Sequence, residues 1–256
     1  MLEGKKIQYK AKEHYIVKDI DFACQNGELV AILGPNGAGK STFLNVIANE
    51  LQSQGNTIFL KSCAYKNWCT RDLPKHKAKF SQAHQADIPL GVQDIIMMGR
   101  YPYFSHIPTE EDLTAINKAM KSIDILHLKD REYSHLSGGE KQRVHLARVL
   151  AQLDNKIDNK LLFLDEPLNN LDILHQHKIM EYIKSFTSTK NTAIVVLHDL
   201  NLAAQFADKI LLLKDGKTVR FGPPEEVMTQ EIISNVYNFP CTITTHPLTN
   251  KPLILF

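Results

Sequence analysis

An α/β fold built on a mainly parallel sheet is the structure that this sequence predicts, and two patterns predict it. Short runs rich in Val, Ile and Leu recur along the chain, as expected of strands buried on both faces: 29–33, 161–164, 193–197 and 210–213. Helical patterns lie between these runs, because apolar residues recur with helical spacing at 43–51, 144–151 and 179–186. Strands that alternate with helices favour a mainly parallel α/β sheet.

Two segments interrupt this alternation. The opening residues to about Phe22, together with 57–65, have the pattern of short strands with turns, and we assign them to a small antiparallel β lobe. Residues from about 92 to 153 have an almost wholly helical pattern, broken at Pro102 and Pro108. We therefore expect one domain, in which a core with its β lobe (about 1–91 and 154–256) carries an inserted helical lobe (about 92–153).

Composition limits the classes of partner. The chain has 256 residues, and its 30 basic and 28 acidic residues leave no excess of positive charge that would indicate a nucleic-acid partner. The four cysteines form no C-x-x-C pair, which is typical of free thiols in a reducing cytosol. No apolar run approaches the roughly 20 residues that span a bilayer, and the first residues lack a secretion signal. We expect a cytosolic chain whose membrane role, if any, comes through partners.

A phosphate-binding loop follows the first predicted strand. Residues 34–41 fit the pattern G-x-x-x-x-G-K-[ST] between a strand and a helix, which is the context that confirms a P-loop NTPase. Glycines allow close backbone approach, successive amides at a helix N-terminus attract phosphate, and the Lys40 charge faces the β- and γ-phosphates. The Ser41 hydroxyl is a hard ligand for Mg²⁺. The predicted ATP contacts are Gly34, Pro35, Asn36, Gly37, Ala38, Gly39, Lys40, Ser41 and Thr42.

A pair of acids ends the predicted strand at 161–164. Asp165 lies where ligands bind in open α/β sheets, at the carboxyl end of a strand, and we expect it to hold Mg²⁺ through a water molecule. Glu166 points elsewhere and is the candidate that polarises the attacking water. Phosphoryl transfer requires mainly positioning and charge neutralisation, which these two carboxylates supply beside the loop.

A third motif separates this chain from other P-loop proteins. Residues 136–143, Leu-Ser-Gly-Gly-Glu-Lys-Gln-Arg, open a predicted helix and resemble the signature of ABC ATPases. The resemblance implies that two copies form a homodimer that sandwiches ATP. It also implies that the signature of one copy contacts nucleotide held by the other, through Ser137, Gly138, Gly139 and Glu140.

Other positions match the same family in order and spacing. Gln82 resembles the Q-loop glutamine, which the family uses to sense Mg²⁺ and the attacking water, and His198 resembles the switch histidine that touches the γ-phosphate. Residues 169–172 resemble the D-loop, in which Asp172 is also a good helix N-cap. Asn169 and Asn170 depart from the Ser/Thr-Ala/Ser that is usual there. The resemblance thus implies Glu166, His198 and Gln82 as catalytic residues, and Ser41, Gln82 and Asp165 at Mg²⁺.

The aromatic residue that stacks on adenine is left open between two tyrosines. ABC ATPases carry such a residue near the N-terminus, and ungapped spacing points to Ala11, between Tyr9 and Tyr15. We favour Tyr9.

A narrower resemblance is to the ATPase subunits of iron-siderophore, cobalamin and haem importers. Gly99-Arg100-Tyr101-Pro102 is typical of that group, and the segments 149–160 and 246–253 are similar to its haem branch. The group implies two membrane permease subunits, a periplasmic binding protein as an indirect partner, and a place on the cytoplasmic face of the inner membrane. Ferric siderophore or cobalamin import is the alternative.

Two readings outside transport are less consistent with the sequence. A soluble ABC ATPase of ribosomes or DNA repair usually has two ATPase domains or a long coiled coil, whereas this chain has one set of motifs. A non-catalytic nucleotide-binding module is disfavoured because Lys40, Asp165, Glu166 and His198 are all present. We expect no direct haem ligation, since His175 and His177 lie two apart on a predicted helix and do not share a face.

Overall fold

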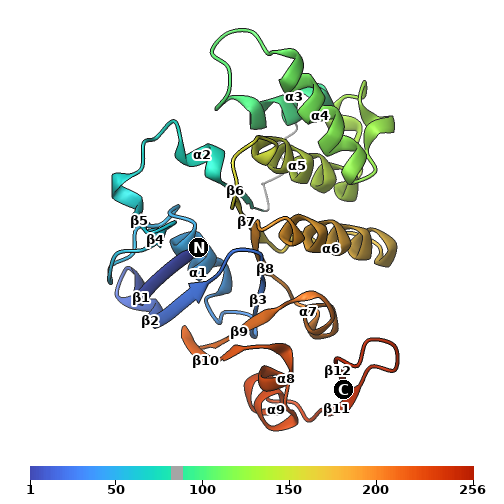
Figure 1. The fold of residues 1–256 in the computed structure, drawn as a ribbon. Helices are drawn as coiled ribbons and strands as arrows, with labels where there is room; N and C mark the ends of the chain where they lie inside the picture. Colours follow the sequence, from blue (N-terminus) through green and yellow to red (C-terminus); the bar gives the residue numbers. More distant parts are fainter. Residues whose placement is uncertain (82–88) are drawn as a thin grey trace.

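The computed structural model describes residues 1–81 and 89–256. Its central feature is a six-stranded sheet in the order β10-β9-β3-β8-β7-β6, in which β9, β3, β8, β7 and β6 are parallel and β10 pairs antiparallel with β9 (Figure 1). The strands are β3 (Leu29–Leu33), β6 (Lys77–Phe80), β7 (Leu161–Asp165), β8 (Thr192–Val196), β9 (Lys209–Lys214) and β10 (Lys217–Gly222). The predicted parallel sheet is confirmed.

Two smaller sheets accompany the central one. The antiparallel sheet has the order β2-β1-β4-β5 and contains β1 (Leu2–Ala11), β2 (His14–Cys24), β4 (Phe59–Leu60) and β5 (Cys63–Ala64). This sheet is the small β lobe that the sequence predicts. A C-terminal hairpin pairs β11 (Thr242–Thr245) with β12 (Pro252–Leu255), and Asn201 exchanges two hydrogen bonds with the backbone of Ile254 to fix it.

Helices surround the sheets. Those of the central region are α1 (Lys40–Ile47), α2 (Leu73–His76), α6 (Ile173–Ser188), α7 (Leu200–Phe206), α8 (Pro224–Val227) and α9 (Gln230–Tyr237). A separate helical group at the top of Figure 1 contains α3 (Val92–Met97), α4 (Glu110–Ser122) and α5 (Gly138–Leu153). Short 3-10 turns occupy Tyr65–Asn67, Met98–Arg100, Leu126–Leu128 and Tyr133–His135. No helix in these described parts is long and apolar enough to cross a membrane.

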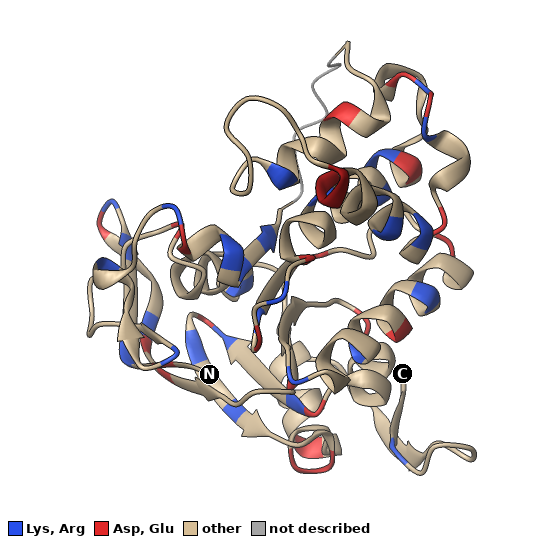
Figure 2. Cartoon of the chain, turned by 45° about the horizontal axis from the view of Figure 1, so that its top comes forward, with Lys and Arg blue, Asp and Glu red and all other residues tan. Residues whose placement is uncertain are grey.

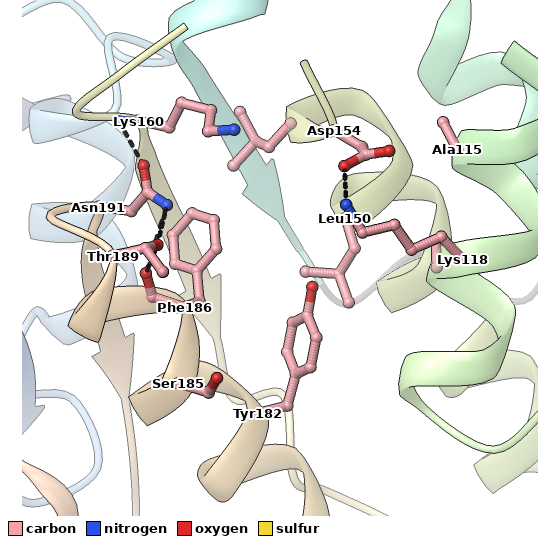
Figure 3. A pocket seen from close by; sticks show the side chains of 12 residues that line it. Ala115, Lys118, Leu150, Asp154, Lys160, Tyr182, Ser185, Phe186, Thr189 and Asn191 are labelled. Atoms are coloured by element: carbon pink, nitrogen blue, oxygen red, sulfur yellow. Dashed lines mark hydrogen bonds and ion pairs between the residues drawn. The ribbon is translucent and has the colours of Figure 1, made fainter. Parts of the chain in front are cut away.

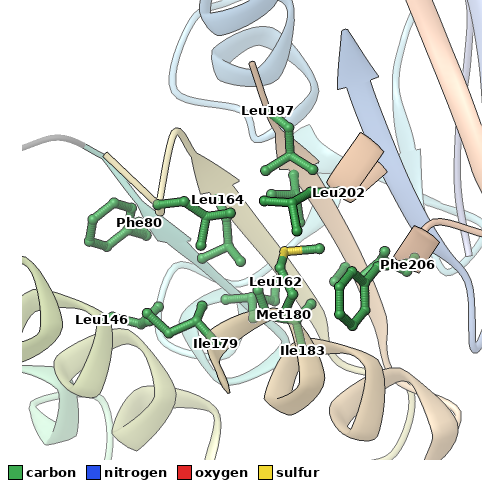
Figure 4. Close-up of a cluster of buried hydrophobic side chains, with 14 of the residues drawn as sticks. Phe80, Leu146, Leu162, Leu164, Ile179, Met180, Ile183, Leu197, Leu202 and Phe206 are labelled. Atoms are coloured by element: carbon green, nitrogen blue, oxygen red, sulfur yellow. The ribbon is translucent and has the colours of Figure 1, made fainter. Parts of the chain in front are cut away.

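The core of the molecule lies on both faces of the central sheet. One cluster packs α5, α6 and α7 against the sheet, and Figure 4 shows Leu162 and Leu164 of β7 among Ile179, Met180 and Ile183 of α6. The second cluster fills the opposite face, including buried side chains of α1 and of the small β sheet. Because β3, β7 and β8 are buried on both faces, their sequences are continuous apolar runs rather than alternating ones.

Elements of the helical group and of the central region line one pocket. A pocket of about 280 Å³ lies between α4, α5 and α6, with Tyr182 and Phe186 on one side and Lys118 on the other (Figure 3). Lys118 forms an ion pair with Asp154 at 2.5 Å on the rim of this pocket. Basic and acidic residues are interspersed over the sheets and the helices (Figure 2), as the balanced composition predicts.

Candidate functional site

The phosphate loop joins β3 to α1 as the sequence predicts, and its glycines are sterically required. Gly34, Gly37 and Gly39 have φ angles of 148°, 79° and 92°, a region that residues with side chains rarely adopt. A Cβ at Gly34 would lie 2.2 Å from the carbonyl oxygen of Leu213, and a Cβ at Gly39 would lie 2.8 Å from that of Ile16. The loop therefore packs backbone against backbone at positions where a side chain would clash.

Lys40 is held at the loop itself. Its ammonium donates to the carbonyl oxygens of Gly34 at 2.8 Å and Pro35 at 3.1 Å. Only 6% of the residue is exposed, and burial lowers the pKa of its side chain despite the nearby carboxylates of Glu166 and Asp165. A buried ammonium on a flexible stem can exchange carbonyl oxygens for phosphate oxygens without leaving its position.

The end of β7 brings a carboxylate to the loop. The Ser41 hydroxyl donates to Asp165 Oδ1 at 2.8 Å, although 124 residues separate the two in the chain. Burial, and then the neighbouring Glu166 carboxylate, raises the pKa of Asp165. A hydroxyl and a carboxylate oxygen side by side are the donor set that Mg²⁺ takes from a protein when phosphates supply further ligands, so these residues fit the ion.

Glu166 lies beside Asp165 in a constrained conformation. Its φ of 51° is left-handed, which is uncommon for a residue with a side chain. His198, which follows β8, places Nε2 2.7 Å from Glu166 Oε1, so the two residues predicted to act on water and γ-phosphate are in contact. Asn169 donates to the other carboxylate oxygen, Oε2, at 2.7 Å. Each oxygen of Glu166 thus has a close partner, Oε2 through a hydrogen bond from Asn169 and Oε1 through its contact with His198.

The predicted signature segment begins α5 with a complete capping box. Ser137 Oγ accepts a hydrogen bond from the amide of Glu140 at 3.4 Å, and Glu140 Oε2 accepts from the amide of Ser137 at 2.8 Å and from its hydroxyl at 2.7 Å. These bonds lower the pKa of Glu140. Because the Glu140 carboxylate is turned toward Ser137, a contact from Glu140 to a phosphate would have to use its backbone amide.

The signature helix also touches the turn that follows Glu166. Gln142 of α5 donates to the carbonyl oxygen of Pro167 at 2.6 Å, a contact that the sequence analysis does not anticipate. A Cβ at Gly139 would lie 3.0 Å from the carbonyl oxygen of Asn170. Asp172 caps α6 by accepting from the amide of His175 at 2.8 Å, as predicted for a good N-cap residue.

The remaining predicted residues are placed as follows. Tyr9 is partly buried in the second core cluster and pairs with Val17, next to Ile16, whose carbonyl oxygen lies against Gly39 of the phosphate loop. Tyr15 is 48% exposed near the hairpin end. Gln82 lies outside the described residues. In the described part of the chain, no hydrogen bond or ion pair joins residues 137–140 to residues 34–42.

Comparison with known proteins gives a consistent result. The family model described as "ABC transporter" matches residues 17–169. A protein of Vibrio vulnificus (strain CMCP6) named Hemin import ATP-binding protein HmuV is 40% identical over 255 residues, covering 99% of this chain and 97% of its own. A protein of the same name from Pseudomonas fluorescens (strain Pf0-1) is 36% identical, covering 100% of this chain and 99% of its own.

Solved structures share the fold. A metal-chelate type ABC transporter in an inward-facing conformation gives a TM-score of 0.82 at 23% identity, covering 99% of this chain and 96% of that one. The ATP-binding cassette MJ0796, in a dimeric post-hydrolysis state bound to ADP and Pi, gives a TM-score of 0.74 at 27% identity, covering 87% and 98%.

Proposed function

This chain belongs to the ABC transporter family, and from that premise we propose that it is the ATP-binding and ATP-hydrolysing subunit of an import complex that energises haem uptake. One observation carries the ATPase part of the proposal. The carboxyl ends of three neighbouring strands bring together Lys40 and Ser41 after β3, Asp165 and Glu166 at β7, and His198 after β8. This arrangement has the parts that phosphoryl transfer to water requires.

Each residue has a definite task in the proposed reaction. The amides of residues 34–42 and the Lys40 ammonium bind the phosphates and neutralise their charge. Ser41 and Asp165 would hold Mg²⁺, with Gln82 as a further proposed ligand, and the ion would supply positive charge to the phosphates. Glu166 would orient the attacking water, and His198, whose Nε2 lies 2.7 Å from Glu166 Oε1, is the proposed contact of the γ-phosphate.

A second copy of the chain completes the site in this proposal. Ser137 and the amides of 138–140 form a helix N-terminus that attracts anions. Among the described residues, they have no hydrogen bond or ion pair to the phosphate loop of their own chain, which is consistent with a role toward nucleotide held by another copy. Two signature segments and two loops would then enclose two ATP molecules at a two-fold interface. Tyr9 is the proposed adenine contact.

Haem is the substrate that the relatives support. Two of the relatives described above bear the name Hemin import ATP-binding protein and match nearly the whole chain. Transport requires membrane permease partners, and we propose two permease subunits, an indirect periplasmic binding protein and a peripheral place at the cytoplasmic membrane face. The helical group, residues 92–153, is the part that we propose to move against the core when ATP binds.

Two experiments test these proposals separately. ATP turnover by the purified chain, and its loss in Glu166→Gln, tests the ATPase. Reconstitution into vesicles with the permease that copurifies from membranes tests the substrate: haem-loaded binding protein should stimulate ATP turnover, whereas a ferric siderophore or cobalamin should not. Stimulation by one of the latter two instead of haem would overturn the substrate assignment and leave the ATPase intact.

A further inference from the structure

The amide of Asn169 is hydrogen-bonded to the carboxylate that we assign to the attacking water. Asn169 Nδ2 lies 2.7 Å from Glu166 Oε2, while His198 Nε2 lies 2.7 Å from Oε1 of the same group. The Glu166 side chain is 22% exposed, so water competes only in part for these bonds. Polar partners on two different oxygens, a hydrogen bond from Asn169 and a close contact with His198, restrict the rotation of the carboxylate plane as well as its position.

We propose that Asn169 is a positioning residue for ATP hydrolysis, which holds Glu166 through the carboxylate oxygen that His198 does not contact. The proposal rests on the proposed ATPase function. A single donor would leave the carboxylate free to rotate about the bond to its carbon chain. With both oxygens engaged, the carboxylate presents its remaining lone pairs in one direction, which is the condition for orienting a water molecule efficiently.

The turn that carries Asn169 is itself fixed by amide side chains. Gln142 of α5 donates to the carbonyl oxygen of Pro167 at 2.6 Å. Gln176 of α6 donates to the carbonyl oxygens of Leu168 at 3.3 Å and Leu171 at 3.1 Å. Because the backbone on both sides of Asn169 is bound to two different helices, its side chain is presented to Glu166 by a supported turn rather than by a free loop.

The residue type matters for this contact. Asparagine supplies an N–H donor three bonds from Cα, whereas a serine hydroxyl lies one bond closer to the backbone and could not span the same gap. Asn169 is one of the two positions at which this sequence departs from the family segment that it resembles, and the usual residue there is Ser or Thr. The structure gives that departure a physical role, because the longer amide reaches the carboxylate within its own chain.

The test compares ATP turnover by Asn169→Leu, which keeps a similar size without the donor, and by Asn169→Asp, which adds a second carboxylate beside Glu166. We expect kcat to fall about tenfold in Asn169→Leu and further in Asn169→Asp, with KM for ATP changed by less than about twofold. Asn117→Leu, a half-buried asparagine on α4 outside the site, is the matched control and should retain kcat within about twofold. If Asn169→Leu fails to fold, judged by its thermal transition, Asn169→Ala replaces it.

A double-mutant cycle separates positioning from other roles. Asn169→Leu added to Glu166→Gln should cause no further loss of the single-turnover rate, because the group that Asn169 positions is already altered. Full additivity, an unchanged kcat in Asn169→Leu, or a raised KM at constant kcat would each overturn the proposal. Absence of ATP turnover by the unaltered chain would instead overturn the proposed function itself.

Discussion

Replacement of Lys40 by methionine should separate nucleotide binding from stability. The ammonium makes two charge-assisted hydrogen bonds, to the carbonyl oxygens of Gly34 and Pro35, each worth about 1.5–3 kcal/mol. Opposing them is the cost of burying a cation, which is several kcal/mol. Methionine fills a similar volume and removes both contributions, so we expect the free energy of unfolding to change by no more than about 1 kcal/mol.

The lowered pKa of Lys40 sets the sign of the remaining stability effect. A lysine whose pKa is lower in the folded than in the unfolded state destabilises the fold, and this cost is fully present below the folded pKa. The cost is relieved as pH rises through the folded pKa. At neutral pH methionine therefore removes an unfavourable contribution, which favours a thermal transition that is unchanged or slightly higher.

Nucleotide affinity should respond in the opposite way. Loss of the contact between the ammonium and the phosphates costs about 3 kcal/mol, which weakens MgATP binding by about 100-fold. Calorimetric titration of both proteins with MgATP measures the affinity, and thermal denaturation without nucleotide measures stability. Equal affinity in Lys40→Met would refute the assignment of the phosphate loop, and a transition lowered by more than about 10 °C would refute the stability argument.

Three further predictions concern other parts of the structure. Glu166→Gln should bind MgATP without hydrolysing it and elute as a dimer with ATP in size-exclusion chromatography; a strictly monomeric protein at high concentration would contradict the proposed interface. Arg100→Met should lose about 3–5 kcal/mol of stability, because Arg100 is 4% exposed, pairs with Asp112 at 2.8 Å and donates to two carbonyl oxygens at 2.7 Å; denaturant titration measures this, and a loss below about 1 kcal/mol would contradict it. Apparent Mg²⁺ affinity should fall as the pH is lowered, and the fall should begin at a higher pH than for an ordinary aspartate ligand because the pKa of Asp165 is raised; the fall should disappear in Asp165→Asn.

The sequence predicts those parts of the site in which the residue types and their spacing are required by one kind of chemistry. The phosphate loop is predicted because its glycines, lysine and serine follow a buried strand and open a helix. The contact between Ser41 and Asp165 could be expected because parallel strands end at one edge of a sheet, and the structure places the two 2.8 Å apart.

The sequence analysis does not predict two strands of the central sheet, because their apolar patterns are weak. β10 contains Lys217, Thr218 and Arg220, so it lacks a buried run, yet Asp215-Gly216 before it is a two-residue hairpin signal with φ angles of 52° and 78°. The short strand β6, Lys-Ala-Lys-Phe, is likewise too polar to be predicted as a buried strand. Both are edge strands of the central sheet, and edge strands commonly carry charged side chains that a buried central strand lacks.

The sequence also does not predict which polar side chains form hydrogen bonds with one another in the folded chain. Asn169 stands out only as a departure from a family pattern, and nothing in its spacing shows that its amide reaches Glu166. Glu140 is predicted to contact nucleotide, and the sequence does not show that its side chain also caps α5. Such outcomes depend on side-chain direction at a turn, which a linear pattern does not encode.

The most direct test of the whole account is a structure of Glu166→Gln with MgATP. We predict that each triphosphate is bound by Lys40 of one copy and by Ser137 of the second copy, across a two-fold axis. A structure in which ATP occupies the loop while the signature segment of every other copy remains remote from it would contradict the account.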